Sequence, residues 1–294
     1  EGIMTVDTTY NCSGTIRVAD YNQNCFNHKA HGTQTVFEAM PNSCNTFFIT
    51  MGQKLGKERF SKYFQAFGFT ETTGIDLPSE GKPVAGKTYY DVSKMGIAEL
   101  SSASFGQTFQ ISPIQMITAV ASLGNGGKLM RPYIVSKILD EDGNIVSETE
   151  PYVKRQVISE KSAKIMTEMM EQVVIWGTAK NAYVAGYHIA GKTGTSEKIG
   201  ANAADQTVAS FVGFAPANNP EIAVFIALDE PQYYATGGSG AAPVAGRIFE
   251  NILAYLNVDP EYSDEEFAKA TVTAPNLIGK ATTDVKASAI GFTV

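Results

Sequence analysis

The sequence of 294 residues carries no excess of positive charge. Its 23 lysine and arginine residues are outnumbered by 30 aspartate and glutamate residues, which leaves a formal net charge of −7 at neutral pH. A chain with this balance has no general attraction for phosphate backbones or anionic lipid headgroups. We therefore expect no nucleic acid partner.

Long apolar runs are lacking as well. No stretch of 18 or more consecutive apolar residues occurs, as a membrane-spanning helix would require. The first residues, Glu1 to Met4, show neither the basic nor the apolar segment of a secretion signal. These two absences leave two expectations open: a cytosolic protein, or one whose targeting segment lies outside this sequence.

The apolar spacing of the chain predicts an α+β fold. With 44% hydrophobic and 18% charged residues, the chain has room for a large core and a small extra module. Helical spacing predicts one helix that ends at Pro41 and further helices over Thr46–Leu55, Lys57–Phe67, Ser112–Gly124, Lys161–Trp176 and Pro243–Leu256. Short β-rich runs predict neighbouring antiparallel strands over Tyr187–Glu197, Thr207–Ala215 and Ile222–Leu228.

A Lys-Thr-Gly-Thr motif, Lys192 to Thr195, lies in the first of these predicted strands. A lysine held on a strand beside two hydroxyl groups offers a fixed cation and hydrogen-bond donors for a carboxylate. Gly194 has no side chain, so a substrate backbone can come close, and a strand edge can pair with an extended peptide. Alone, the motif also fits a glycine bulge in a strand with a surface lysine.

A Ser-x-Asn motif, Ser43 to Asn45, falls in the predicted turn between two helices. By itself it fits simple capping of the helix that follows. The order and the contexts of the two motifs change this interpretation, because Ser-x-Asn in a helix-to-helix turn and Lys-Thr-Gly on a strand are two of the three motifs of penicillin-recognising serine enzymes. Their conjunction favours a functional site.

The third motif, Ser-x-x-Lys, carries the nucleophile in such enzymes and precedes Ser-x-Asn. The only Ser-x-x-Lys in this sequence runs from Ser79 to Lys82, after Ser-x-Asn, within a loop bounded by prolines. We interpret Ser79 as a turn residue and not as a nucleophile. The chain is therefore expected to hold the substrate-binding half of an active site without its attacking serine.

The resemblance extends beyond short motifs. Four segments resemble the transpeptidase domain of class B penicillin-binding proteins, namely Ala39–Phe48, Gly74–Pro78, Ser104–Gln107 and Ala190–Thr195. The resemblance covers most of the chain up to Leu256 and implies the penicillin-binding-protein/β-lactamase fold, an antiparallel sheet flanked by helices. The sequence Asn-Ser-Cys-Asn, at residues 42–45, favours the branch of Firmicutes enzymes that serves sporulation.

The family chemistry is acyl transfer between peptidoglycan stem peptides, in which a serine attacks the D-Ala-D-Ala carbonyl and an amine of a neighbouring strand resolves the acyl-enzyme. The resemblance implies that Ser43 relays protons near the leaving group and that Asn45 holds a substrate amide. It implies that Lys192, with the hydroxyl groups of Thr193 and Thr195, binds the terminal carboxylate or its β-lactam mimic. The backbone N–H of Thr195 would form half of an oxyanion hole.

The resemblance also implies where the protein acts and what accompanies this chain. It implies an extracytoplasmic location, a membrane anchor and the nucleophile in an upstream part of the same protein, and a glycosyltransferase partner. We expect a transpeptidase domain over residues 1–256 that lacks its N-terminal part, a linker over 257–271, and the start of a PASTA module over 272–294. An irregular C-terminal extension is the alternative for the last segment.

The few cysteine and histidine residues of the chain cluster near its start. Cys25-x-x-His28 has a spacing that can place a sulfur and an imidazole on one ion. We expect a structural zinc site made of Cys12, Asp20, Cys25 and His28, with His31 as a substitute. The extracytoplasmic location implied by the family leaves a Cys12–Cys25 disulfide as an alternative, beside free thiols. We expect Cys44 to be a small buried side chain.

Two other functions share these motifs. A serine β-lactamase would hydrolyse its acyl-enzyme rapidly, and a non-catalytic protein that binds β-lactams or the cell wall would need no nucleophile. The length of the segment and the PASTA-like start speak against the β-lactamase.

Overall fold

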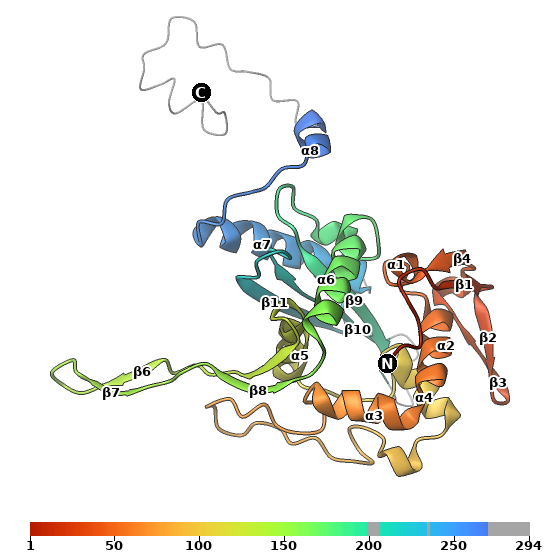
Figure 1. The fold of residues 1–294 in the computed structure, drawn as a ribbon, viewed down its shortest axis with the longest axis horizontal. Helices are drawn as coiled ribbons and strands as arrows, with labels where there is room; N and C mark the ends of the chain where they lie inside the picture. Colours follow the sequence, from red (N-terminus) through yellow and green to blue (C-terminus); the bar gives the residue numbers. More distant parts are fainter. Residues whose placement is uncertain (199–205, 234–235, 270–294) are drawn as a thin grey trace, which may run out of the picture.

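The structure is a computed structural model that describes residues 1–198, 206–233 and 236–269. A three-stranded sheet with packed helices lies at the centre (Figure 1). A helical lobe with two small strand pairs lies beside it, and a long β-ribbon projects from the body.

The central sheet consists of β9 (Ala190–Glu197), β10 (Thr207–Ala215) and β11 (Ile222–Asp229) in the order β11-β10-β9. Both neighbouring pairs are antiparallel, which confirms the predicted arrangement. Successive side chains of a strand point to opposite faces, so Phe211 and Phe214 of β10 face different layers of helices. β9, which carries the lysine motif, is an edge strand.

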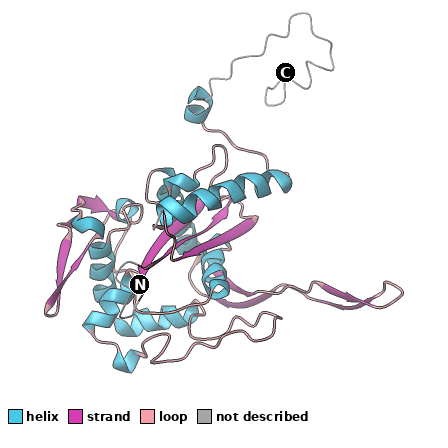
Figure 2. Cartoon of the chain, turned by 180° about the vertical axis from the view of Figure 1, so that it is seen from behind, coloured by secondary structure: helices cyan, strands magenta, loops and turns pink. Residues whose placement is uncertain are grey.

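Helices cover the sheet on both faces (Figures 1 and 2). On one face, Phe249 and Leu253 of α7 (Ala242–Tyr255) pack with Phe211 in a fully buried cluster. On the other face, α5 (Pro113–Gly124) and α6 (Glu160–Ile175) pack around Phe214, and α6 also contributes valines to the first cluster. Burial of these large side chains is the main term that holds the sheet in place.

The helical lobe faces the edge strand β9. Its helices are α1 (Val36–Ala39), α2 (Asn45–Leu55), α3 (Lys57–Ala66) and α4 (Ile97–Ser104), with short 3-10 turns η1 (Phe26–His28) and η2 (Val92–Lys94). Its strands form two antiparallel pairs, β1 (Thr9–Cys12) with β4 (Gly32–Thr35) and β2 (Thr15–Val18) with β3 (Tyr21–Asn24). Phe47 anchors α2 in a buried cluster with Val36 and Met169, which joins the lobe to α6.

The β-ribbon links α5 to α6. It consists of two antiparallel pairs, β5 (Lys128–Arg131) with β8 (Tyr152–Gln156), and β6 (Lys137–Leu139) with β7 (Ile145–Glu148). Figure 1 shows how far the outer pair extends from the body. Every residue of β6 and β7 is exposed.

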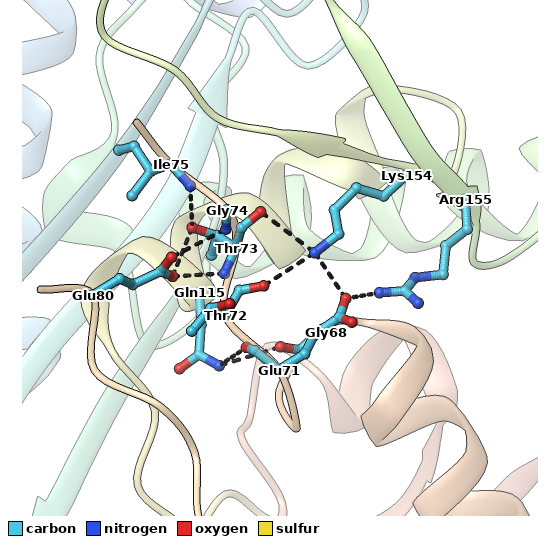
Figure 3. A network of polar contacts seen from close by, with 10 residues as sticks. All are labelled: Gly68, Glu71, Thr72, Thr73, Gly74, Ile75, Glu80, Gln115, Lys154 and Arg155. Carbon is cyan, nitrogen blue, oxygen red and sulfur yellow. Dashed lines mark hydrogen bonds and ion pairs between the residues drawn. The ribbon is translucent and has the colours of Figure 1, made fainter. Parts of the chain in front are cut away.

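A polar network fixes the loop over residues 68–80 against this ribbon (Figure 3). The Glu80 carboxylate accepts hydrogen bonds from the backbone N–H and hydroxyl of Thr73, at 2.6 and 2.7 Å, and from the N–H of Gly74 at 3.0 Å. Lys154 on β8 pairs with Glu71 at 2.8 Å and donates to the Thr72 carbonyl at 3.1 Å. The loop that contains Ser79 is thus held by Glu80 within it and by Lys154 from β8.

The remaining short elements lie near the C-terminal side: η3 (Lys180–Ala182), η4 (Gly237–Ala241) and α8 (Asp264–Lys269). Part of the expected linker packs on the domain, because Glu261 donates its N–H to the Gly186 carbonyl at 2.7 Å and Glu266 accepts from Gly186 at 3.0 Å. The expected PASTA segment, 272–294, lies outside the described residues. Within the described ranges, no helix combines the length and the apolar character needed to cross a bilayer.

Candidate active site

The turn between α1 and α2 presents Ser43. The Thr35 and Glu38 capping box begins α1, and the turn closes with the Cys44 N–H donating to the Ala39 carbonyl at 3.0 Å. Ser43 has a φ of 50°, a left-handed conformation that a residue other than glycine adopts at a cost in strain. The structure therefore confirms the predicted turn between two helices. It also shows that the backbone is strained at Ser43.

Lys192 on β9 faces this turn. Its Nζ donates to Ser43 Oγ at 2.9 Å and to its neighbour's carbonyl, Thr193 O, also at 2.9 Å. The residue is partly exposed to the cleft, but protein encloses the ammonium group, and this burial lowers the pKa of Lys192 to about 8. The two sequence motifs, 149 residues apart in the chain, thus meet through one hydrogen bond.

The threonines of the lysine motif are already oriented. Thr193 Oγ1 lies 2.8 Å from Thr178 Oγ1, a partner that the sequence motifs did not indicate. Thr195 Oγ1 accepts the N–H of Gly237 at 3.1 Å, so its own proton is available to donate to a ligand. This arrangement suits the binding of a carboxylate at the edge of β9.

Gly194 has a structural reason to lack a side chain. A Cβ at Gly194 would lie 2.6 Å from Ser210 Oγ on β10. The loop that leads into α7 also approaches closely, because a Cβ at Gly237 would lie 2.5 Å from the Gly194 carbonyl oxygen. We expected Gly194 to make room for a substrate backbone, and the structure shows that it also makes room for its own neighbours.

Asn45 begins α2 and lines the same cleft. Its Nδ2 donates to the Asn24 carbonyl at 2.9 Å. This bond fixes the carboxamide plane and leaves its oxygen as the atom that a substrate N–H can reach.

These groups line a long open cleft of about 1620 Å³. Ser43 and Asn45 form part of one wall and Lys192 to Ser196 part of the other, with Trp176 and Thr178 at the end of α6. Ser79 is exposed and does not line the cleft, in agreement with its interpretation as a turn residue. The sequence contains no other Ser-x-x-Lys.

A second group of reactive side chains lies directly behind the Ser-x-Asn turn. Cys12, Cys25, His31 and Cys44 place one ligand atom each within 4.8 Å of one another. The sulfur atom of Cys25 lies 3.7 Å from Cys12 Sγ and 3.8 Å from Cys44 Sγ. Cys12 Sγ lies 3.3 Å from His31 Nδ1. The three cysteines are free, so the alternative Cys12–Cys25 disulfide is not formed.

The cluster differs from the expected ligand set at two positions. Cys12 and Cys25 belong to it as expected, and His31 belongs to it as the expected substitute. Asp20 and His28 are exposed and stand outside it. Asp20 falls in the turn between β2 and β3, and η1 ends at His28, which has a φ of 54°. Cys44 is fully buried as expected, yet its sulfur faces Cys25.

Hydrogen bonds surround the sulfur atoms. Thr46 Oγ1 donates to Cys12 Sγ at 3.2 Å, and the Gly14 N–H donates to the same sulfur at 3.4 Å. Hydrogen bonding from Cys44 lowers the pKa of Cys25 to about 4, and the same contact raises the pKa of Cys44. Hydrogen-bond donors that point at a sulfur favour its thiolate form, which is the form of cysteine that binds a metal.

Comparison with known proteins places the chain in a family of transpeptidase domains. A family model described as the penicillin binding protein transpeptidase domain matches residues 1–253. Stage V sporulation protein D of Bacillus subtilis is 37% identical over 279 residues, which is 92% of this chain and 43% of that protein. This relative agrees with the branch that the sequence favoured.

Two further similarities support the assignment. The peptidoglycan D,D-transpeptidase PbpA of Mycolicibacterium smegmatis is 32% identical over 218 residues, or 72% of this chain and 42% of that protein. The crystal structure of penicillin-binding protein 3 from Mycobacterium tuberculosis, complexed with ampicillin, matches with a TM-score of 0.80 at 25% identity, covering 88% of this chain and 59% of that one. The chain spans less than half the length of these two curated relatives.

Proposed function

The chain belongs to the penicillin-binding protein transpeptidase family, and we propose that it forms the substrate-binding part of a peptidoglycan D,D-transpeptidase. The observation that carries this proposal is the 2.9 Å hydrogen bond between Lys192 Nζ and Ser43 Oγ across the cleft. It joins the two motif walls at the point where an acyl donor would end.

In this proposal each side chain acts through a group that the structure orients. The ammonium of Lys192 and the hydroxyl of Thr195 bind the terminal carboxylate of a stem peptide or of a β-lactam. The Asn45 oxygen accepts a substrate N–H. Ser43 accepts its hydrogen bond from Lys192, so the Ser43 proton is directed away from the lysine and can pass to a leaving amine.

The attacking serine comes from a segment outside this sequence, since the chain has no suitable Ser-x-x-Lys. We propose that residues 1–256 are the C-terminal part of the transpeptidase domain and that the upstream part of the same protein completes it. We also propose an extracytoplasmic role in cell-wall or spore-cortex synthesis, which relatives named for sporulation and for peptidoglycan transpeptidation support. A membrane anchor, a glycosyltransferase partner and a PASTA module after the linker are further parts of this proposal.

Penicillin labelling of the complete protein tests the function. The complete protein should form a covalent adduct with a fluorescent penicillin, and Lys192→Ala should nearly abolish it because the carboxylate loses its cation. Lys161→Ala, an exposed lysine on α6, is the matched control and should label normally. Unaltered labelling of Lys192→Ala would contradict the assigned role.

The chain of 294 residues should form no acyl adduct by itself. Intact mass spectrometry after incubation with penicillin measures this directly, and a mass increase of one acyl group would refute the assignment of the nucleophile to another segment. The non-catalytic binder remains the second candidate, favoured by the missing motif, and it predicts no adduct even in the complete protein. Rapid turnover of a chromogenic β-lactam by the complete protein would instead indicate a β-lactamase.

We also propose that Cys12, Cys25, His31 and Cys44 hold a structural zinc ion. A tetrahedral zinc with Zn–S bonds of about 2.3 Å sets its sulfur ligands about 3.8 Å apart. The sulfur separations of 3.7 and 3.8 Å fit this geometry, and the donor set of three cysteines and one histidine is a common structural one. The ion would brace the segment that leads into the Ser-x-Asn turn, without a chemical step of its own.

A further inference from the structure

Thr178 contacts both walls of the cleft from one position. It follows the end of α6 and is exposed to the cleft. Its backbone N–H donates to the Pro41 carbonyl at 3.1 Å, and its hydroxyl lies 2.8 Å from the hydroxyl of Thr193 on β9. Pro41 belongs to the turn that carries Ser43. A residue outside both motifs thus connects the two segments that carry them.

These bonds close a ring with the hydrogen bond that crosses the cleft. Lys192 Nζ donates to Ser43 Oγ and to the Thr193 carbonyl, both at 2.9 Å. From Thr193 the ring continues through Thr178 to Pro41, which lies two residues before Ser43. A ligand carboxylate competes with Ser43 for the ammonium of Lys192, whereas the bond from Thr178 to Pro41 uses no atom assigned to ligand binding. This second connection therefore persists when a ligand binds.

Close packing fixes the backbone around Thr178. A Cβ at Gly177 would lie 2.8 Å from the Pro41 carbonyl oxygen, so the chain before Thr178 packs directly on the turn. A Cβ at Gly238 would lie 2.4 Å from the Thr178 carbonyl oxygen, so η4 packs on it as well. Ala179 is fully buried. Backbone packed this closely has little freedom to move.

The turn that Thr178 contacts is strained. Ser43 has a φ of 50°, and such a conformation persists only where the surroundings determine it. The Ser43 N–H donates to the Met40 carbonyl at 3.0 Å, which fixes the shape of the turn. The bond from Thr178 to Pro41 fixes the position of the turn relative to β9, because Thr178 also contacts that strand.

The hydroxyl of Thr178 determines what Thr193 can offer to a ligand. A hydroxyl has one proton to donate, and a carboxylate can only accept. When a carboxylate binds, Thr193 therefore donates its proton to the ligand and accepts the proton of Thr178. Hydrogen bonds in such a chain polarise one another, which strengthens the bond from Thr193 to the carboxylate.

We propose that Thr178 is a positioning residue of the acyl-transfer site. Its N–H sets the Ser43 turn against β9, and its hydroxyl orients the Thr193 hydroxyl toward the carboxylate of the acyl donor. The inference rests on the proposed function, because it requires a carboxylate at Thr193. Thr178 touches no reacting group and acts through Thr193 and the turn.

Acylation kinetics of the complete protein test the hydroxyl, with the second-order rate constant for labelling by a fluorescent penicillin as the measurement. Thr178→Val keeps the shape of the side chain and should slow labelling roughly fivefold, the effect of one lost hydrogen bond. Thr178→Ser retains the hydroxyl and should recover most of that loss. Thr15→Val is the matched control, because it removes an exposed hydroxyl that donates to Asn24 and does not line the cleft. It should label normally.

A double variant separates the positioning role from a general structural one. If Thr178 acts through Thr193, Thr178→Val should slow labelling little further in a Thr193→Val background, because the proton that it orients is already gone. Independent effects would multiply instead, and this outcome would overturn the role of the hydroxyl. Melting temperatures of all variants show that each is folded at the assay temperature.

Gly177→Ala tests the backbone contact. The added Cβ meets the Pro41 carbonyl and should displace the Ser43 turn, so labelling should slow at least as much as in Thr178→Val. Gly81→Ala adds a Cβ that meets nothing within 4 Å and should label normally. A folded Gly177→Ala that labels at the wild-type rate would refute the role of the turn contact, and the Thr178 variants decide the inference if Gly177→Ala does not fold.

The same measurements keep this inference separate from the proposed function. Wild-type labelling rates in Thr178→Val would overturn the positioning role and leave the transpeptidase assignment intact. Equally slow labelling by Thr178→Val and Thr178→Ser would also overturn it, because the hydroxyl would not be the acting group. Absence of labelling in the wild-type complete protein would overturn both proposals.

Discussion

Lys192 combines two opposing demands at one residue. A carboxylate ligand requires the ammonium to be charged, but burial favours the neutral amine and lowers its pKa to about 8. The hydrogen bonds to Ser43 Oγ and Thr193 O hold the group in place without supplying a negative charge. The pKa of Lys192 therefore lies close to neutral pH, where a ligand carboxylate can decide the protonation state of the amine.

This balance predicts a pH dependence of ligand binding. Only the protonated lysine attracts a carboxylate, so affinity for a D-Ala-D-Ala dipeptide should be highest below pH 8 and should fall as the pH rises through that value. Calorimetric titrations between pH 6.5 and 9.5 measure this. Lys192→Arg keeps its charge throughout that range and should remove the decline; an affinity for wild type that stays constant to pH 9.5 would contradict the assignment.

The glycine before Lys192 makes a second prediction at the residue scale. A Cβ at Gly191 would lie 2.3 Å from the Phe211 ring, which is fully buried between the sheet and α7. Gly191→Ala should therefore destabilise the chain by about 1–3 kcal/mol, the usual penalty for overpacking a core. Thermal or urea unfolding measures the change.

Gly81→Ala is the matched control, because an added Cβ there meets nothing within 4 Å. Its free energy of unfolding should stay near that of wild type. Equal stability of the two variants would show that the Phe211 ring shifts freely.

The motif residues were predictable from the sequence, but some of the residues that contact them were not. Ser43, Asn45 and Lys192 were identified because their types and order match a known chemistry, and the structure brings them to one cleft. Thr178 and the pairing of Cys44 with Cys25 were missed, because these contacts depend on where separate elements meet. Cys44 thus lies inside the Ser-x-Asn motif and also belongs to the neighbouring cysteine cluster.

At the scale of elements, the loop before Ser79 depends on one carboxylate. Burial opposes the ionisation of Glu80, but hydrogen bonds from Thr73 and Gly74 outweigh it and hold the pKa of Glu80 below its ordinary value. Its stabilising effect is therefore fully present above the ordinary glutamate pKa and is lost as the pH falls through the lowered one. Glu80→Gln should reduce the free energy of unfolding by about 1 kcal/mol at neutral pH.

Hydrogen exchange locates the effect of Glu80→Gln. The amides of Thr73 and Gly74 should exchange faster in the variant, since both lose a charged acceptor. Glu58→Gln, an exposed position on α3, should change neither these amides nor the stability. Unchanged protection of both amides in Glu80→Gln would contradict the role of this carboxylate.

Elements with a buried side were predictable from the sequence. The runs that became β10 and α5 match their predictions because one side of each faces the core. The β-ribbon was not predicted, because β6 and β7 bury no residue and so carry no periodic signal. The paired strands around the cysteine cluster are only four residues long, too short for a pattern to develop.

On the scale of the whole molecule, the cleft has walls from two differently stabilised parts. The β9 wall belongs to a sheet with large buried side chains from α6 and α7. The Ser43 wall belongs to a lobe of short strand pairs, whose buried cluster contains all three cysteines. A small lobe of this kind gains most from a cross-link, and a metal ion is the cross-link that the free sulfurs can provide.

The native chain should therefore contain about one zinc ion, measured by elemental analysis. Removal of the ion by a chelator should lower the melting temperature by roughly 5 °C, because the ion binds the folded chain far better than the unfolded one. Cys25→Ser and His31→Gln should each lose the ion, since both residues supply a ligand atom to the cluster.

Two variants separate the observed cluster from the ligand set that the sequence suggested. His28→Gln and Asp20→Asn should keep their zinc, because both side chains are exposed outside the cluster. Loss of zinc from His28→Gln with retention in His31→Gln would restore the Cys-x-x-His spacing as the ligand pair. A native sample without zinc would contradict the proposed metal site. The Ser-x-Asn turn would then depend on Phe47 packing and on its own hydrogen bonds.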